Sequence, residues 1–148
     1  MELRKLSGED RELIRNLFRD VFTHEPWMDD WSDEVQLEAY ISDLTGQSNS
    51  LALGFFTEGK MVALSMGQIR HWYTGTEYVV DEFCVDRAYQ GRGTGKAFLG
   101  AMEAYLRETG IQQIFLQTER DAPAYGFYLH CGFQEMTGHV SFAKRIRS

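Results

Sequence analysis

The sequence predicts a single α/β domain in which helices flank a mixed, mostly antiparallel sheet. Its 148 residues suit one domain, and 43% hydrophobic residues are enough for a full core. Two apolar runs flank the turn dipeptide Glu58-Gly59, which is typical of an antiparallel hairpin. A strand, a helix and a second strand then follow over residues 77–118, and such a crossover predicts that these two strands are parallel.

The N-terminal third predicts a strand and two helices. Leu3–Leu6 favours a short strand, and Ser7 is expected to cap a helix that ends near Pro26. Ser32 is the expected N-cap of a second helix that runs to about residue 44. This second helix is expected to turn four apolar residues mostly inward: Val35, Leu37, Ile41 and Leu44.

The rest of the chain predicts the sheet and two more helices. Gly110 and Gly132 suit the positions that follow helix ends, and Pro123 suits a first helical turn. The expected elements are strands 51–56, 61–70 and 77–86, a helix 93–108, a strand 111–118, a helix 123–130, and one or two strands within 134–147. The element order is therefore β-α-α-β-β-β-α-β-α-β-β.

Charge argues against one class of partner. The net charge is −7, which makes nucleic acid an unfavourable partner. Nine of the 22 acidic residues fall between Asp20 and Gly59, a stretch that contains no Lys or Arg. This stretch is either a solvated acidic helix face or a negative rim that concentrates a cationic ligand.

The chain gives no sign of export, membrane insertion or metal binding. No apolar run approaches the roughly 20 residues of a membrane helix, and Met1–Asp10 lacks the apolar region of a secretory signal. Cys84 and Cys131 are too few for a disulfide framework or a zinc cluster. We therefore expect a cytoplasmic protein with reduced cysteines, no membrane partner and no metal.

A glycine-rich turn, Gln90–Lys96, separates the strand 77–86 from the next helix. Alternating glycines let backbone N–H groups surround an anion such as pyrophosphate, and the helix N-terminus adds its positive end. The turn is not a Walker A loop, because Gln90 and Ala97 replace the required glycine and hydroxyl, and it also fails the dinucleotide fingerprint. It fits the pattern Q/R-x-x-G-x-G/A; the alternative is a tight turn that binds nothing.

The segments on both sides of this turn complete a family pattern. With residues 79–86 before it and 124–133 after it, the chain resembles the Gcn5-related N-acetyltransferase (GNAT) superfamily. The resemblance covers the whole chain in element order and is most specific from Glu77 to Phe133. It implies one N-acetyltransferase domain over 1–148, an acetyl-CoA-dependent acyltransferase whose two central parallel strands splay apart around acetyl-CoA.

The resemblance also implies which residues bind acetyl-CoA. Backbone groups at the strand edge would contact the pantetheine arm, and the turn would hold the pyrophosphate. The implied set is Phe83, Cys84 and Val85 at the strand edge, Gln90, Gly91, Arg92, Gly93, Thr94, Gly95 and Lys96 in the turn, and Asp121 and Phe127 beyond it. Asp121 stands where the family usually has Asn, and so lacks the amide donor.

Acetyl transfer to an amine requires a base and a proton donor for the leaving thiolate. Asp81 and Glu82 precede the pantetheine edge and look like the acidic pair of polyamine acetyltransferases. The match makes Asp81 the base and Glu82 its neighbour, although a bulge would reverse them. Tyr128 matches the tyrosine that protonates the CoA thiolate, and we expect direct attack in a ternary complex. The alternatives are solvent-facing carboxylates and a buried structural tyrosine.

In this superfamily the first two helices and their connecting loop frame the acceptor site. Trp27, Asp30 and Trp31 of that loop, together with Glu77, would supply rings and carboxylates for a small cationic amine. This resembles aminoglycoside and polyamine acetyltransferases, with an aminoglycoside 6′-type activity as the leading expectation. Both tryptophans could instead be core residues. A protein Lys or N-terminal acetyltransferase, a non-catalytic acetyl-CoA-binding regulatory module and a homodimer all stay open.

Overall fold

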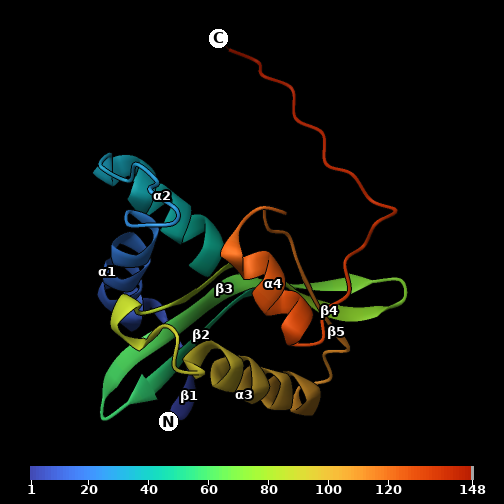
Figure 1. Ribbon diagram of the computed structural model, residues 1–148, viewed down its shortest axis with the longest axis horizontal. Coiled ribbons are helices and arrows are strands. Elements are labelled where there is room, and N and C mark those ends of the chain that lie inside the picture. Colours follow the sequence, from blue (N-terminus) through green and yellow to red (C-terminus); the bar gives the residue numbers. More distant parts are fainter. Residues whose placement is uncertain (148) are drawn as a thin grey trace. The chain divides into compact units, whose positions relative to one another are not determined.

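The computed structural model describes residues 1–147. The chain divides into two units, of which the first is Met1–Gln117 and the second begins at Thr118. The first unit contains a five-stranded sheet in the order β1-β2-β3-β4-β5 (Figure 1). Its strands are β1 (Glu2–Lys5), β2 (Ser50–Thr57), β3 (Lys60–Trp72), β4 (Gly75–Val85) and β5 (Gln113–Leu116). All neighbours are antiparallel except β4 and β5, which are parallel. The predicted mixed sheet and its parallel pair are confirmed.

Helices cover both faces of this sheet (Figure 1). Helices α1 (Arg11–Phe22) and α2 (Glu34–Thr45) pack on one face, and α3 (Thr94–Glu108) packs on the other. Residues of β2 alternate between the two cores, since Ala52 packs with α1 and α2 whereas Leu51 and Leu53 pack with α3. We call these the α1/α2 core and the α3 core.

The first two helices start one to three residues later than expected. Ser7 forms a capping box with Asp10 on a short 3₁₀ turn, η1 (Gly8–Asp10), that leads into α1. Asp33, not Ser32, caps α2, because its Oδ1 accepts hydrogen bonds from the N–H groups of two first-turn residues at 3.0 and 3.1 Å. Val35 is 81% exposed, so its expected inward position is wrong. The buried stripe of α2 consists of Leu37, Ile41 and Leu44, which share one helix face.

The second unit contains α4 (Pro123–His130), with the predicted boundaries and Pro123 in its first turn. No residue within 134–147 lies in a strand, so the expected final strands are wrong. Val140 and Phe142 alternate as in a strand, but they remain 77% and 94% exposed. Alternation alone does not make a strand where it buries no apolar surface. Among residues 1–147, no helix is both long and apolar enough to cross a bilayer.

Candidate active site

A β-bulge interrupts β4 at the predicted acidic pair. Along β3, Met66 pairs with Glu82 and Gly67 pairs with Val80, which makes Asp81 the extra residue. A bulge of this kind reverses the side-chain alternation that follows it. The structure therefore contains the bulge that, in the sequence analysis, would reverse the roles of Asp81 and Glu82.

The reversal turns Glu82 toward the α1/α2 core. Val80 before the bulge and Phe83 after it both pack with the α3 core, although they are an odd number of positions apart. Cys84 packs in the α1/α2 core, and Glu82 contacts α2 on that same face. Asp81 is exposed. The two neighbouring carboxylates thus occupy different environments.

Gly67 of β3 makes the bulge sterically feasible. A Cβ atom there would lie 2.0 Å from the carbonyl oxygen of Val79 and 2.9 Å from the Cα atom of Val80. Only glycine allows the two backbones to approach this closely. The position of Glu82 consequently depends on a residue of the neighbouring strand.

Glu82 has the properties of a base that works near neutral pH. Burial raises its pKa to about 7; the charges of Asp81 and Asp29 add to this effect, and a hydrogen bond from Tyr40 opposes it. The Tyr40 hydroxyl donates to Glu82 Oε2 at 2.5 Å. Although Asp81 is exposed at the surface, partial loss of solvation by neighbouring groups also raises its pKa, and the charge of Arg70 opposes that rise. Tyr40 and Asp29 are site residues that sequence reasoning missed.

The loop between α1 and α2 brings Trp31 next to Tyr40. Their rings stack with centroids 5.4 Å apart and planes 12° apart. Trp27 packs against Phe22 with centroids 5.6 Å apart, and both tryptophans are half-buried against the α1/α2 core. Trp31 Nε1 is buried without a hydrogen-bond partner among the described residues. The tryptophans therefore anchor the loop against the α1/α2 core, which is the alternative that the sequence left open.

Two other predicted acceptor residues make local hydrogen bonds. Asp30 is exposed and accepts a hydrogen bond from the Ser32 N–H at 3.0 Å, and hydrogen bonding from Ser32 lowers the pKa of Asp30. Glu77 accepts a hydrogen bond from the Gln113 side chain of β5 at 2.9 Å. The structure thus groups Glu82, Tyr40 and Trp31, while Asp30 and Glu77 have other immediate partners.

Beyond the bulge, β4 extends past the end of its pairing with β5. Pairing runs from Glu77–Gln113 to Val80–Leu116, whereas β4 continues to Val85. The segment Phe83–Val85 was predicted to face pantetheine. In this segment the Phe83 ring stacks on Phe98 and the Cys84 side chain is buried. Burial raises the pKa of the Cys84 thiol, so it is a packing group and not a nucleophile.

The glycine-rich turn ends as the N-terminus of α3. Gly91 and Gly93 have φ angles of +76° and +79°, in the left-handed region that favours glycine. Gly93 is the N-cap and provides no side-chain cap for the first N–H groups of α3. Thr94 is buried, whereas Arg92 and Lys96 are exposed. Uncapped N–H groups at a helix start can bind an anion.

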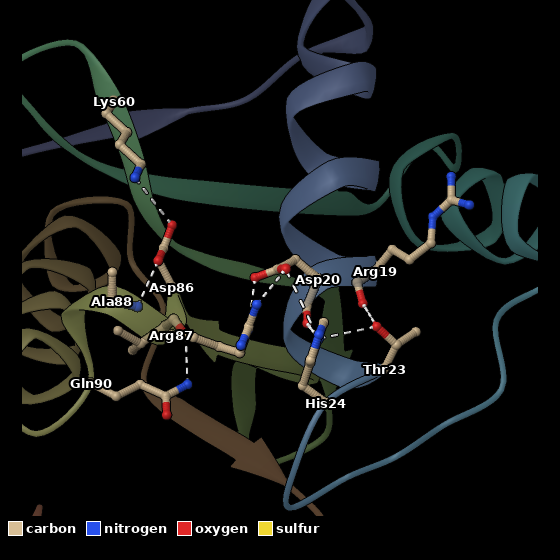
Figure 2. Close-up of polar contacts among 10 residues, drawn as sticks. Arg19, Asp20, Thr23, His24, Lys60, Asp86, Arg87, Ala88 and Gln90 are labelled. Atoms are coloured by element: carbon tan, nitrogen blue, oxygen red, sulfur yellow. Dashed lines mark hydrogen bonds and ion pairs between the residues drawn. The ribbon is translucent and has the colours of Figure 1, made fainter.

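Polar contacts hold the segment Asp86–Gln90, which leads into this turn, against its neighbours (Figure 2). Arg87, in the short 3₁₀ turn η2 (Arg87–Tyr89), donates two hydrogen bonds to Asp20 of α1 at 3.0 and 3.1 Å. Asp86 lies 3.6 Å from Lys60 at the start of β3, and the Gln90 side chain donates to the Val85 carbonyl at 2.9 Å. Exposed ion pairs add little stability, but together these contacts fix the turn beside the end of β4.

Replacing Gly93 by Ala is expected to weaken acetyl-CoA binding about 10- to 100-fold, because strain at this φ displaces N–H groups that would hold a charged phosphate. Isothermal titration calorimetry measures the affinity. Gly59→Ala is the matched control: Gly59 has a φ of +81° in the β2–β3 turn. It should lose similar stability and keep wild-type acetyl-CoA affinity. Equal affinity in all three proteins would contradict the anion site.

Three predicted residues, Asp121, Phe127 and Tyr128, lie in the second unit. Tyr128 packs within that unit against the rings of Phe127 and Phe133, with centroids 5.3 and 5.2 Å away. Asp121 is exposed. Their roles stay predictions.

A groove of about 1030 Å³ lies elsewhere in the first unit. It is bounded by the ends of β2 and β3 and by α3, and its lining includes Asn49, Arg70, Trp72 and Tyr105. None of the predicted site residues lines this groove, although its lining includes Arg70, whose charge acts on Asp81.

Residues 11–133 match the model of the Acetyltransferase (GNAT) family, which is most of the chain. The chain belongs to this family. As a GNAT acetyltransferase it is 28% identical over 119 residues to aminoglycoside N(6′)-acetyltransferase type 1 of Stenotrophomonas maltophilia, over 76% of this chain and 78% of that protein. The resemblance inferred from the glycine turn and its flanks is confirmed.

Solved GNAT structures share the fold. One is aminoglycoside acetyltransferase AAC(6′)-Iy with a CoA-S-monomethyl-acetylneamine bisubstrate analogue, at a TM-score of 0.73 and 17% identity over 97% of each chain. Another is a ribosomal-protein-alanine N-acetyltransferase of Brucella melitensis, at a TM-score of 0.75 and 16% identity over 99% of this chain and 100% of that one. The same fold therefore serves both small-molecule and protein acceptors.

Proposed function

We propose that this GNAT enzyme transfers the acetyl group of acetyl-CoA to a primary amine of a small cationic acceptor of the aminoglycoside type. The observation that carries the proposal is the position of Glu82, whose side chain the bulge turns toward Tyr40 on the α1/α2 side, where Trp31 stacks on the Tyr40 ring. Asp29 and Asp81 add negative charge around it, which favours a cationic ligand. The name of the Stenotrophomonas maltophilia relative supports a 6′-amine as the acceptor group.

Acetyl-CoA would lie along β4 and the glycine turn. N–H groups from Gly91 to Lys96 hold the pyrophosphate, and the pantetheine arm follows Phe83–Val85, beyond the pairing of β4 with β5. With acetyl-CoA in this orientation, the thioester would lie near the bulge. The CoA analogue bound to the AAC(6′)-Iy fold neighbour supports acetyl-CoA as the co-substrate.

In the proposed reaction, Glu82 accepts a proton from the acceptor ammonium group, directly or through one water. The neutral nitrogen then attacks the thioester carbonyl carbon to form a tetrahedral intermediate. The carbon–sulfur bond breaks as this intermediate collapses, and its nitrogen releases a second proton to solvent to give the amide. The departing thiolate is protonated to the CoA thiol, a step for which the family resemblance alone names the Tyr128 hydroxyl as donor, and that donor regains its proton from solvent. Trp27 and Asp30 border the acceptor in this scheme, and Glu77 adds charge farther along β4.

A single domain over 1–148, a cytoplasmic location and a homodimer stay predictions.

A CoA-release assay with a panel of acceptors tests the proposal. The panel pairs two aminoglycosides that differ only in carrying an amine or a hydroxyl at the 6′ carbon, and adds a polyamine, a Lys peptide and a peptide with a free N-terminus. Turnover is expected with the 6′-amine and not with its hydroxyl analogue. Faster turnover of a peptide would indicate a protein acetyltransferase. Acetyl-CoA binding without any turnover would indicate a binding module.

The KM of a multiply charged amine is expected to rise about three- to tenfold between 50 and 500 mM salt, because salt screens its attraction to exposed carboxylates. Steady-state kinetics at saturating acetyl-CoA measure this rise. A singly charged amine is the control and should show a smaller rise. If neither KM changes with salt concentration, electrostatic attraction to the carboxylates does not contribute to binding of the acceptor.

A further inference from the structure

We propose that Tyr40 is a positioning residue for the base: its hydroxyl fixes the Glu82 carboxylate, and Trp31 fixes the Tyr40 ring. The inference rests on the proposed function, in which Glu82 accepts the proton. It assigns a role to a helix α2 residue that no sequence motif marks.

The hydrogen bond holds one carboxylate oxygen. Tyr40 reaches from α2 to β4 and donates its Oη–H to Glu82 Oε2 at 2.5 Å. Because Oε2 accepts this bond, Oε1 is the Glu82 oxygen that takes the proton from the acceptor amine. A carboxylate on a strand next to a bulge would otherwise have several rotamers open to it. The bond selects one of them, and a fixed geometry is what proton transfer requires.

Ring packing holds the tyrosine in turn. Trp31 stacks on Tyr40 with planes 12° apart, and Phe18 of α1 lies 5.9 Å from Tyr40 and 5.4 Å from Trp31, centroid to centroid. Trp31 Nε1 is buried and has no hydrogen-bond partner among the described residues. Leaving a donor unpaired costs free energy, so ring packing and not its N–H holds Trp31 here. Trp31 thereby links the acceptor loop to the base.

The charges around Glu82 and its hydrogen bond from Tyr40 act on the pKa of Glu82 in opposite directions. Glu82 faces Tyr40 from α2, Asp29 from the α1–α2 loop, and Asp81 and the buried Cys84 from its own strand. Both carboxylates raise the pKa of Glu82, and the Tyr40 hydrogen bond opposes them. Burial and Glu82 raise the pKa of Tyr40 itself, so it stays a protonated donor. Removing the hydroxyl should therefore raise the pKa of Glu82 above its value of about 7.

The test is a titration of Glu82 in the ligand-free protein. Carboxyl ¹³C NMR of glutamate-labelled wild type and Tyr40→Phe is recorded across pH, and Glu82→Gln assigns the signal by its loss. The midpoint is expected to rise by about one to two pH units in Tyr40→Phe. Tyr105→Phe makes the same chemical change at a half-buried tyrosine of the α3 core and should leave the midpoint unchanged. A shift below about 0.3 units in Tyr40→Phe would overturn the proposal.

Kinetic measurements then separate the role of Glu82 as the base from the role of Tyr40 as its positioning residue. The acid limb of kcat/KM for the amine should move to higher pH in Tyr40→Phe by the same amount, while the KM of acetyl-CoA stays constant. Trp31→Leu is a second variant that keeps the hydroxyl and should shift the limb in the same direction by less. If Glu82→Gln retains the limb, the assignment of Glu82 as the base fails. If only Glu82→Gln loses it, and Tyr40→Phe and Trp31→Leu match wild type, the role of Tyr40 alone fails.

Discussion

Glu82→Gln is expected to lower kcat by about 10²- to 10⁴-fold, since the amide cannot accept the proton of the acceptor amine. Acetyl-CoA affinity should stay at the wild-type value, because the substitution lies outside the glycine turn that would bind pyrophosphate. CoA release under saturating substrates measures kcat, and calorimetry measures the affinity. The matched control is Glu103→Gln, at an exposed position of α3. A kcat within about threefold of wild type in Glu82→Gln would exclude this residue as the base.

The same variant should be more stable than wild type at alkaline pH. The pKa of Glu82 is about 7 in the folded chain and about 4.3 in an unfolded chain. Folding therefore favours the protonated carboxyl, and this contribution to stability is present below pH 4 and lost as the pH rises toward 7. Gln mimics the protonated form, so Glu82→Gln should gain up to about 3 kcal/mol at pH 8 and nothing at pH 4. Chemical denaturation at both pH values measures the difference. A stability loss at pH 8 would contradict it.

Gly67→Ala is expected to reduce stability and activity together. The new Cβ would lie 2.0 Å from the Val79 carbonyl oxygen, a backbone atom that cannot move without shifting the strand. We expect a loss of about 3 kcal/mol in the free energy of unfolding. We also expect a fall of about 10²-fold in kcat, because the displaced bulge moves Glu82 away from the acceptor. Urea denaturation and steady-state kinetics measure the two effects.

Gly100→Ala is the control for this substitution. Gly100 is an exposed residue of α3 where an added Cβ would meet nothing within 4 Å. Alanine should stabilise the helix there by up to about 1 kcal/mol and leave kcat unchanged. If Gly67→Ala keeps wild-type kcat while folded, the bulge does not position the base.

Local patterns predicted much of this fold and part of its site. Gly91 and Gly93 supply positive φ angles where the sequence placed an anion-binding turn, and Pro123 begins α4 as expected. Each of these features depends on one or two neighbouring residues. The sequence marks such features because backbone conformation and helix starts are set locally.

Features that depend on distant residues were predicted less well. The bulge at Asp81 requires Gly67 on the adjacent strand; a glycine inside a strand was its one local sign. Tyr40 lies between Leu37 and Ile41 of the buried stripe of α2, and nothing in its sequence neighbourhood indicates a bond to Glu82, 42 residues away. The bulge and this bond together decide which carboxylate is buried. The choice between Asp81 and Glu82 as the base stayed open in the sequence analysis, because neither the bulge nor the Tyr40 hydrogen bond is determined by neighbouring residues.

A crystal structure of the protein with CoA and an aminoglycoside bound tests the role of Glu82 as the base most directly. We expect the acceptor nitrogen to lie about 3 Å from a Glu82 oxygen, or to be joined to it through one water. We also expect the aminoglycoside to contact the α1–α2 loop. An aminoglycoside seated in the groove beside Arg70 and Trp72, with its reacting amine out of reach of Glu82, would contradict this role.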